Sequence, residues 1–552
     1  MSPIVKKVYG IDLGTTYSCL AYVDEHGKAI VVPNFENERI TPSAVFFDGD
    51  NVIVGKDAKD NAKISPHSVV EMIKRSMGDQ NYRFEHQGKV FRPEEISAFI
   101  LRKIVGDGEK VLGVKITDVI ITCPAYFGVN QRDATAKAGE IAGLNVRSII
   151  NEPTAAAIAY ALEKVKDQVV LIYDLGGGTF DITMIEVKGG AITVLCTGGD
   201  HNLGGKDWDS CIVKYLETQY QEQTGTLEDI LGDSETLQDL FSAAESAKKS
   251  ISIRDKVSTV VTHNGQKVKV ELLRDKFNEL TAPLLERTIA LTSQMLEEAK
   301  IKGYSRFDKI LLVGGSSRMP QVAKRLKEEF LVDCEMYDPD ESVAKGAAIY
   351  GWKLAIDEEI KLVIADKTGQ KIGDIDLGKT SQLDVTKAHK EVAAKFGLTP
   401  NVVSTAANTT VNNVTSKSFG IVIQHESKTE MVSNLILRND KVPANITSPF
   451  QTVSADQTGV DIRLMEGQEL IRTVELLKCT EIGKGELKLP PKLPKGYPFE
   501  VNFKLNEQGR LEVTATDPVS KNVLQFEVQT NSVMSDEEVS KAKTRGLAIP
   551  VS

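Results

Sequence analysis

The chain has 552 residues, a formal net charge of −10 at pH 7, 41% hydrophobic residues and 26% charged residues. At roughly 100–200 residues per domain, this length predicts three or four globular domains. The acidic charge and the lack of a Lys/Arg-rich block argue against a nucleic-acid partner. No run reaches the roughly 18 apolar residues of a membrane span, and the first ten residues have no apolar signal core. We therefore expect no membrane partner and a cytoplasmic location, with the six scattered cysteines reduced.

The first part of the chain mixes strands and helices. Residues 8–23 read as strand, tight turn and strand, because β-branched and aromatic residues flank "DLGTT". A buried strand is expected over 116–127, ending at Pro124. Helices are expected over 130–143 and 151–164, the second with Pro153 in its first turn.

The next part repeats the same plan. "VVLIYDLGGGTFDITMIEV" (169–187) is a second strand–Asp–Gly-turn–strand unit about 160 positions after the first, which suggests an internal duplication. Helical apolar spacing follows over 234–254 and 275–302. Residues 309–330 give a strand, a Gly-Gly-Ser turn and a helix, and 338–355 give a capped helix. Alternating strands and helices make this region α/β.

The pattern of expected strands and helices changes after about residue 356. The stretch 361–377 resembles a hairpin around Thr368-Gly369, and 386–400 has helical spacing. Residues 404–413 are polar and turn-prone, which suggests a linker. From 414 to 530 the chain alternates short strands and turns, typical of an all-β domain, and a short capped helix starts near 535.

The two Asp-bearing glycine turns, at 12–16 and 174–181, suggest phosphate binding. Backbone N–H groups in a turn without side-chain bulk can converge on phosphate oxygens. An aspartate at the strand end would repel phosphates, so we expect it to act through Mg²⁺, which prefers oxygen ligands and keeps several waters. One such turn could be a plain tight hairpin. A third glycine turn at 313–320 makes a nucleotide site the stronger interpretation.

The motifs "GIDLGTTYS", "KRSMGD", "CPAYF", "NEPTAAAIAYAL", "DLGGGTFDIT", "GGDHNLGGKDWD" and "VGGSSRMP" closely resemble the 70-kDa heat-shock chaperone family, within the actin, hexokinase and chaperone ATPase superfamily. The match runs nearly continuously from about 8 to 355 and resumes more weakly from about 413 to 530. The resemblance implies a two-lobed α/β actin/hexokinase-like ATPase domain followed by an all-β sandwich peptide-binding domain.

The resemblance assigns roles around the phosphates. Asp12 and Asp174 resemble the carboxylates that hold the water shell of Mg²⁺. Lys74 resembles the lysine that positions the attacking water, although a lone lysine would usually be a solvated surface residue. Glu152 and Asp181 resemble the acidic partners that orient water and metal. The two phosphate loops would consist of Gly14, Thr15, Thr16, Gly176, Gly177, Gly178 and Thr179, of which Thr179 is also expected to be catalytic.

Adenosine contacts follow in the same way. Glu245, Lys248 and Ser252 lie at i, i+3 and i+7 on one helix face, which by spacing alone could be an ordinary solvated stripe. The resemblance places this face beside ribose and adenine. It also places the base between this helix and a loop that covers the base from the other side, formed by Gly314, Gly315, Ser316 and Arg318. Asp340 resembles a residue that closes this pocket. Pro124 and Arg132 match residues thought to transmit the nucleotide state, although Pro124 could simply end a strand.

The β domain resembles the peptide-binding sandwich of the family. By position, a peptide groove would be lined by Ile421, Phe450, Val453, Val460 and Ile462. An extended peptide can bond along strand-flanked loops while an apolar pocket takes its side chains. For Ile421 and Ile462, a place in the sandwich core fits the alternation equally well.

Three departures from the family pattern affect this interpretation. Roughly 55 residues stand where a short apolar linker is usual, the long helical lid is not visible, and the segment between Lys74 and Glu152 is short, as in bacterial forms. We expect an ATPase domain over 1–356, an atypical insert or linker over 357–413, a β sandwich over 414–534 and a helical stub over 535–552.

The sequence thus predicts an ATP-dependent chaperone that uses ATP or ADP with Mg²⁺ and binds unfolded, apolar polypeptide segments. A J-domain co-chaperone and a nucleotide-exchange factor would be its partners. One alternative is a nucleotide-binding scaffold or co-chaperone whose ATPase is uncoupled from peptide binding. Another is an actin-like filament protein or a small-molecule kinase, although the β domain would have no place in a sugar kinase.

Overall fold

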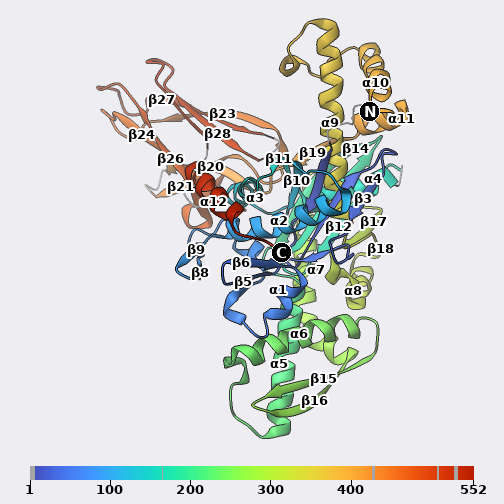
Figure 1. The fold of residues 1–552 in the computed structure, drawn as a ribbon. Coiled ribbons are helices and arrows are strands. Elements are labelled where there is room, and N and C mark those ends of the chain that lie inside the picture. Colours follow the sequence, from blue (N-terminus) through green and yellow to red (C-terminus); the bar gives the residue numbers. More distant parts are fainter. Residues whose placement is uncertain (1–6, 164–165, 426–428, 507–508, 528–532) are drawn as a thin grey trace.

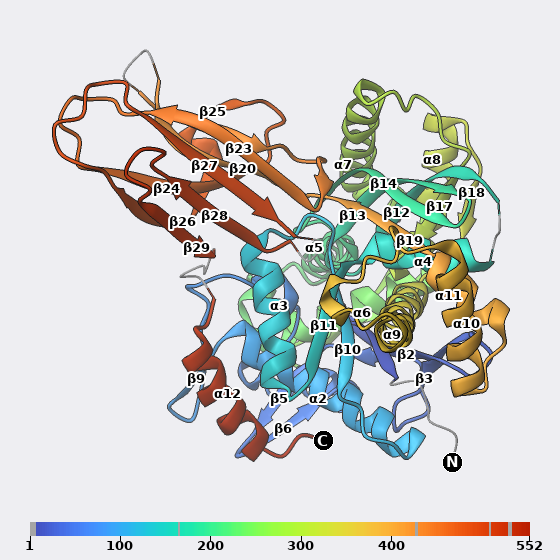
Figure 2. The same cartoon turned by 90° about the horizontal axis from the view of Figure 1, so that it is seen from above.

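The computed structural model describes residues 7–163, 166–425, 429–506, 509–527 and 533–552. Two large sheets, a smaller helical extension and a β sandwich make up the chain (Figures 1 and 2). We use "unit I" for the elements around the first large sheet and "unit II" for those around the second. The α/β character of the first part and the all-β character of 418–527 agree with the sequence.

Unit I is built on a sheet with the strand order β11-β10-β1-β2-β3, in which β10 runs parallel to β1 and β11. Its strands are β1 (Val8–Asp12), β2 (Tyr17–Val23), β3 (Ala29–Val32), β4 (Thr41–Pro42), β10 (Asp118–Cys123) and β11 (Asn145–Asn151). Around them lie α1 (Lys56–Asn61), α2 (Pro93–Leu112), α3 (Val129–Ile141), the 3₁₀ turn η2 (Ile73–Ser76) and the short strands β5 (Val45–Asp48), β6 (Asn51–Val54), β7 (Val69–Val70), β8 (Phe84–His86) and β9 (Lys89–Phe91).

Unit II repeats the opening plan of unit I. Its sheet has the order β18-β17-β12-β13-β14-β19-β22, made of β12 (Gln168–Leu175), β13 (Phe180–Lys188), β14 (Ala191–Asp200), β17 (Lys309–Val313), β18 (Cys334–Met336), β19 (Thr410–Val414) and β22 (Lys441–Val442). Its other elements are α5 (Gly205–Thr224), α6 (Ser234–Ile251), β15 (Lys256–His263), β16 (Gln266–Leu273), α7 (Arg274–Ile301) and α8 (Pro320–Phe330). The strand–turn–strand predictions for 8–23 and 169–187 are confirmed by β1–β2 and β12–β13.

Two helices join the units. α4 (Glu152–Glu163) packs on the second sheet, α9 (Ser342–Thr368) packs on the first sheet, and the two helices pack on each other. The contact is so close that a Cβ at Gly346 of α9 would lie 1.7 Å from the carbonyl oxygen of Ala155 in α4. The Ala-rich face of α4 and this glycine therefore set the distance between the units.

The hairpin expected around Thr368-Gly369 is wrong. α9 continues to Thr368, and Gly369 ends it in the left-handed conformation with φ 70°. Ile356, Ile360 and Ile364 are buried at a spacing of four, so they extend the helical stripe of α9. The β-branched run "LVI" favoured a strand locally, but packing on the core decides for the helix.

Residues 404–413, for which the sequence suggests a turn-prone linker, are the end of α11 (Pro400–Asn408) and β19. The helix predicted within 386–400 is confirmed as α10 (Gln382–Phe396). Together, α10, α11 and the end of α9 form a helical extension beside unit I (Figure 1). Its buried face, which includes Val392 and Val403, belongs to the same core as α4 and α9.

The β sandwich consists of two antiparallel sheets around one apolar core. One sheet contains β25 (Thr473–Glu475), β21 (Glu430–Ile436), β20 (Ser418–Gln424), β24 (Gly459–Gly467) and β26 (Cys479–Lys488). The other contains β23 (Ala444–Gln451), β27 (Pro498–Leu505), β28 (Leu511–Thr516) and β29 (Val523–Glu527). α12 (Asp536–Ala548) follows and lies alongside α3 (Figure 2).

Substitution of Gly346 by Ala tests the close helix contact. We expect Gly346→Ala to lower the free energy of unfolding by at least about 2 kcal/mol, because the methyl group must displace backbone of α4. The measurement is the thermal unfolding midpoint. Gly106→Ala in α2 is the matched control, since a Cβ there meets no atom within 4 Å, and it should be neutral or stabilising by up to about 1 kcal/mol. Equal midpoints for the two variants would contradict the packing argument.

Candidate active site

A cavity of about 750 Å³ lies between units I and II. This volume is typical of a small-molecule or cofactor site. Most of the site residues predicted from the sequence line it, namely Asp12, Gly14, Thr15, Thr16, Lys74, Glu152, Asp174, Gly176, Gly177, Thr179, Glu245, Lys248, Ser252, Gly314, Gly315, Ser316, Arg318 and Asp340. Gly178 and Asp181 lie next to it but do not line it.

The glycine turns of the two units touch each other. A Cβ at Gly177 would lie 2.3 Å from Oγ1 of Thr16, and one at Gly178 would lie 2.3 Å from Cγ2 of Thr15. Glycine is required here because of space, since any side chain would push the two turns apart. The β1–β2 turn and the β12–β13 turn therefore form one continuous part of the cavity lining.

The third glycine turn approaches the second in the same manner. Gly314, after β17, has φ 79°, and a Cβ there would lie 2.4 Å from Oδ1 of Asp174. A Cβ at Gly205, where α5 begins, would lie 2.3 Å from Oγ of Ser316. Both the backbone conformation and the close approach exclude other residues at Gly314.

Hydrogen bonds fix the orientation of the Gly176–Gly178 turn. Each of its carbonyl oxygens accepts a hydrogen bond from another segment of the protein. The oxygen of Gly176 accepts from N of Gly205 at 2.9 Å, that of Gly177 from N of Lys206 at 2.8 Å, and that of Gly178 from Nε of Arg75 at 2.8 Å. The N–H and C=O of one peptide group point in opposite directions. Holding the carbonyl oxygens toward α5 and Arg75 therefore directs the N–H groups the other way, as an anion-binding turn requires.

Three buried carboxylates, those of Asp12, Asp174 and Asp181, lie next to these turns. Burial, with a smaller effect of Glu152, raises the pKa of Asp12 to about 7, and Thr122 donates a hydrogen bond of 3.0 Å to Asp12. Burial and Glu152 also raise the pKa of Asp174 and that of Asp181 well above the usual range. Burial and the neighbouring negative charge both disfavour the ionised carboxylates, so a bound cation would stabilise them.

This donor set fits Mg²⁺, which binds oxygen ligands and retains waters. Asp181 has one oxygen bonded to N of Ala125 at 2.8 Å, while its buried Oδ2 has no protein partner. Within the described residues, no three His, Cys, Asp or Glu side chains lie close enough to hold an ion by themselves.

Lys74 is the positive charge within this cluster. It lies in η2, two residues after Met72, whose φ is 60°, and the residue is only 5% exposed. Its Nζ forms a buried ion pair with Glu152 at the start of α4. Although burial opposes it, the negative charges of Glu152 and Asp12 raise the pKa of Lys74. Lys74 therefore stays charged and links unit I to α4.

The predicted adenosine side lies at α6 and the third turn. Nζ of Lys248 is buried and bonds to Asp209 and to the carbonyl oxygen of Gly205, both at 2.8 Å. Ser252 donates to the carbonyl oxygen of Lys248 within its own helix. Arg318 and Asp340 form an ion pair at the opposite wall.

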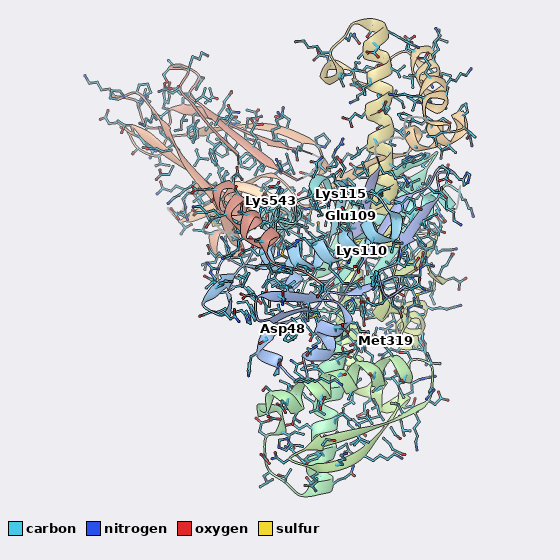
Figure 3. All side chains as sticks on the ribbon, viewed as in Figure 1. Asp48, Glu109, Lys110, Lys115, Met319 and Lys543 are labelled. Atoms are coloured by element: carbon cyan, nitrogen blue, oxygen red, sulfur yellow. The ribbon has the colours of Figure 1, made fainter. Side chains whose placement is uncertain are left out.

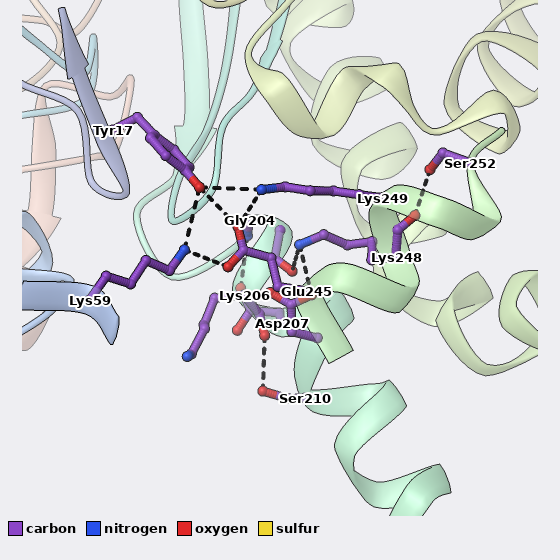
Figure 4. A network of polar contacts seen from close by, with 12 residues as sticks. Tyr17, Lys59, Gly204, Lys206, Asp207, Ser210, Glu245, Lys248, Lys249 and Ser252 are labelled. Carbon is purple, nitrogen blue, oxygen red and sulfur yellow. Dashed lines mark hydrogen bonds and ion pairs between the residues drawn. The ribbon is translucent and has the colours of Figure 1, made fainter. Parts of the chain in front are cut away.

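An ion-pair network between residues that line the cavity joins the two units (Figure 4). Glu245 of α6 pairs with Lys59 of α1 at 2.5 Å and with Lys249 at 2.8 Å, and it accepts a hydrogen bond from Tyr17. Although burial opposes it, the charge of Lys59 and the bond from Lys249 lower the pKa of Glu245 to about 2. Sequence analysis named Glu245 but missed Tyr17, Lys59 and Lys249, because only the fold brings α1 and α6 together.

The residues proposed for peptide binding do not form one exposed surface. Ile421 and Ile462 lie in the sandwich core, Val460 packs against that core, and Phe450 stacks on Phe499 with ring centroids 6.0 Å apart. Only Val453, of the five, is exposed, at 47%. Alternation along a strand predicts which residues share a face, but it does not distinguish a core from a groove.

The proline and arginine singled out in the sequence lie at the edge of unit I. Pro124 directly follows β10, as predicted. Arg132 of α3 bonds to Asn151 and to the carbonyl oxygen of Phe127. Gly509 of the β sandwich lies against its side chain, where a Cβ would be 3.3 Å from Cδ of Arg132. Arg132 thus touches both the end of β11 and the sandwich.

A family model described as Hsp70 protein matches residues 8–87, 79–373 and 391–546. The chain belongs to the Hsp70 family. The resemblance seen in the motifs is thereby confirmed, and members of this family are ATP-dependent chaperones. Between residues 8 and 546 the Hsp70 match omits 374–390, which lies in the helical extension and includes the first part of α10. No helix of the described residues is long and apolar enough to cross a membrane.

The depressed pKa of Glu245 gives a pH-dependent prediction. A carboxyl whose pKa falls on folding stabilises the protein above its unfolded value of about 4.5, and this stabilisation is lost as the pH falls from there to about 2. Glu245→Gln should lower the thermal midpoint by about 2–4 °C at pH 7, and the difference should stay constant from pH 8 to pH 5. A difference that already shrinks between pH 6 and pH 5 would contradict the depressed pKa. The control is Glu286→Gln, which removes an exposed pair with Arg325 inside unit II and should have a smaller effect.

Proposed function

We propose that this protein is an ATP-dependent chaperone that binds extended apolar polypeptide segments and regulates its affinity for them by ATP hydrolysis. Units I and II would be the two lobes of the ATPase, with ATP or ADP and Mg²⁺ in the cavity between them. The observation that carries the proposal is the meeting of three glycine turns beside buried carboxylates and Lys74. Membership of the Hsp70 family supports it independently.

The chain's residues have distinct roles in this proposal. The amides of the first two turns bind phosphate oxygens, and Lys74, held by Glu152, places a positive charge and a donor beside them. Asp12 and Asp174 would hold Mg²⁺ through water, and the ion would supply charge that neutralises the phosphates. Thr179 would complete the polar wall near the second turn, and Asp181 would orient water and metal from behind it.

The adenosine half of the nucleotide would lie between α6 and the third turn. Glu245, Lys248 and Ser252 would border ribose and base on one side, and Gly314, Gly315, Ser316, Arg318 and Asp340 on the other. Lys206 also lines the cavity, and its Nζ lies 3.7 Å from the centre of the Phe241 ring. This contact was not expected from the sequence.

The β sandwich would bind the polypeptide, with Val453 the exposed member of the five proposed peptide-binding residues. Unfolded clients, a J-domain co-chaperone and a nucleotide-exchange factor would be partners in the cytoplasm. We propose that the ATPase domain ends at residue 356, the insert at 413 and the β sandwich at 534.

A nucleotide-binding scaffold with uncoupled peptide binding is the second candidate. The helical extension favours it, because α10 and α11 fill the region where the family usually has a short linker, and the Hsp70 match omits part of it. Peptide affinity that is equal in ATP and ADP would select this candidate.

Lys74→Met tests the proposed activity. The variant keeps an unbranched side chain that is one atom shorter and removes its charge, so ATP turnover in the presence of an unfolded peptide should fall about 100-fold or more. The measurement is steady-state phosphate release, with the thermal midpoint as a check on folding. Peptide affinity of the unmodified protein should differ between ATP and ADP.

Lys206→Met is the matched control, because Lys206 lines the same cavity beside Phe241. It should change KM more than kcat. Undiminished turnover in Lys74→Met, or no turnover in the unmodified protein, would overturn the proposal.

A further inference from the structure

The short segment between β7 and η2 brings Lys74 to the cavity. β7 pairs antiparallel with β5, whose last residue, Asp48, is labelled in Figure 3. Glu71 and Met72 are the whole connection from β7 to η2. The chain therefore passes from an extended strand to a tight turn within two residues, and Lys74 then reaches Glu152.

Met72 makes this change in the left-handed region of the backbone. Its φ is 60° and its ψ is 21°. Non-glycine residues rarely adopt this conformation, because the Cβ comes too close to a backbone carbonyl oxygen. In the described part of the chain, Met72 is the only non-glycine residue with a positive φ that lines the cavity. Such conformations gather at functional sites, so Met72 is a candidate for a functional role.

The turn that follows Met72 sends three neighbouring side chains to three different places. The carbonyl oxygen of Met72 accepts a hydrogen bond of 3.0 Å from N of Arg75, which closes the turn. With about three residues per turn, successive side chains of a 3₁₀ helix leave its axis roughly 120° apart. Ile73 is accordingly buried in the core of unit I, Lys74 enters the carboxylate cluster, and Arg75 reaches unit II.

Contacts on both sides of Lys74 hold this turn in place. Nε of Arg75 donates to the carbonyl oxygen of Gly178 at 2.8 Å, and the guanidinium pairs with Asp207 at 2.9 Å. On the other side, Ile73 is fixed in the core of unit I. A different backbone conformation at Met72 would therefore break one of these contacts or turn Lys74 away from the cavity.

The side chain of Met72 also touches the cavity lining. A Cβ at Gly178 would lie 3.0 Å from Cε of Met72, so the methyl group lies against the second glycine turn. A role in packing would favour any large apolar side chain at this position, whereas a role of the backbone favours glycine. Packing and backbone conformation therefore predict opposite orders for substitution by glycine and by valine.

We propose that Met72 is a positioning residue for the proposed hydrolysis and that it acts through its left-handed backbone. This conformation turns η2 so that Lys74 meets Glu152 beside the phosphate turns, while the thioether contributes little. The role rests on the proposed function, which gives Lys74 its place in the reaction. It adds a residue outside the three glycine turns to those on which the position of Lys74 depends.

Substitutions by valine and by glycine test the proposal on the full chain. Valine is branched at Cβ and opposes a positive φ, whereas glycine adopts it without strain. We expect Met72→Val to lower kcat for ATP, with an unfolded peptide present, about tenfold. KM should change less than about twofold, because the charge of Lys74 is needed in the reaction more than in binding. Met72→Gly should keep kcat within about threefold of the unmodified protein.

The reactivity of Lys74 gives a second measurement, which needs no nucleotide. A buried ammonium paired with a carboxylate is acylated slowly by an N-hydroxysuccinimide ester, and mass spectrometry of the Lys74 peptide measures the rate. Acylation should be about tenfold faster in Met72→Val and should stay within about twofold of the unmodified protein in Met72→Gly. Absent turnover in the unmodified protein would overturn the proposed function, while the order of these acylation rates would still decide the role of Met72.

Leu331 provides the matched control. It ends α8 in the left-handed conformation with φ 55°, is 86% exposed and lies outside the cavity lining. Leu331→Gly and Leu331→Val make the same changes there, and both should leave kcat and the acylation of Lys74 as in the unmodified protein. Thermal midpoints check that each variant folds.

The order of the two Met72 variants decides the outcome. Equal effects of Met72→Val and Met72→Gly, or a larger effect of Met72→Gly, would overturn the proposal. If Met72→Val does not fold, Met72→Gly decides alone, because packing predicts a loss of turnover and faster acylation, and the backbone predicts neither.

Discussion

The close approach of glycine turns from two separate sheets is the constraint on which the structure depends. Gly177 meets Thr16, Gly178 meets Thr15, and Gly314 meets Asp174, each at a distance that leaves no room for a Cβ. The paired strands that flank these turns fix the positions of the turns at the ends of the sheets, and the packing of α4 on α9 fixes the separation of the two sheets. A cavity lined by all three glycine turns follows from this geometry.

Charge balance gives that cavity its chemistry. Burial raises the pKa values of Asp12, Asp174 and Asp181, while Lys74 supplies a buried positive charge among them. Under the proposed function, Mg²⁺ would balance these carboxylates, and a polyphosphate would accept hydrogen bonds from the amides of the second turn. Ion pairs centred on Glu245, which lines the cavity, join the two units.

Local patterns in the sequence were sufficient where one segment determines its own structure. The turns after β1 and β12 and the helix α10 could be predicted because glycine, capping and spacing signals lie within a few residues. The end of α9 could not, because "LVI" favours a strand until the core that buries Ile360 and Ile364 is known. The pairing of Lys59 with Glu245, like the burial of Ile421, depends on contacts between distant segments.

The β sandwich is held between the two units, by β19 on one and by residues 533–552 on the other. The sandwich therefore contacts both of the units that enclose the cavity. The most direct test is a crystal structure with Mg²⁺ and a non-hydrolysable ATP analogue. The account predicts the phosphates between residues 12–16 and 174–179, with the base beside 314–318. Failure to bind the analogue, or binding elsewhere on the chain, would contradict it.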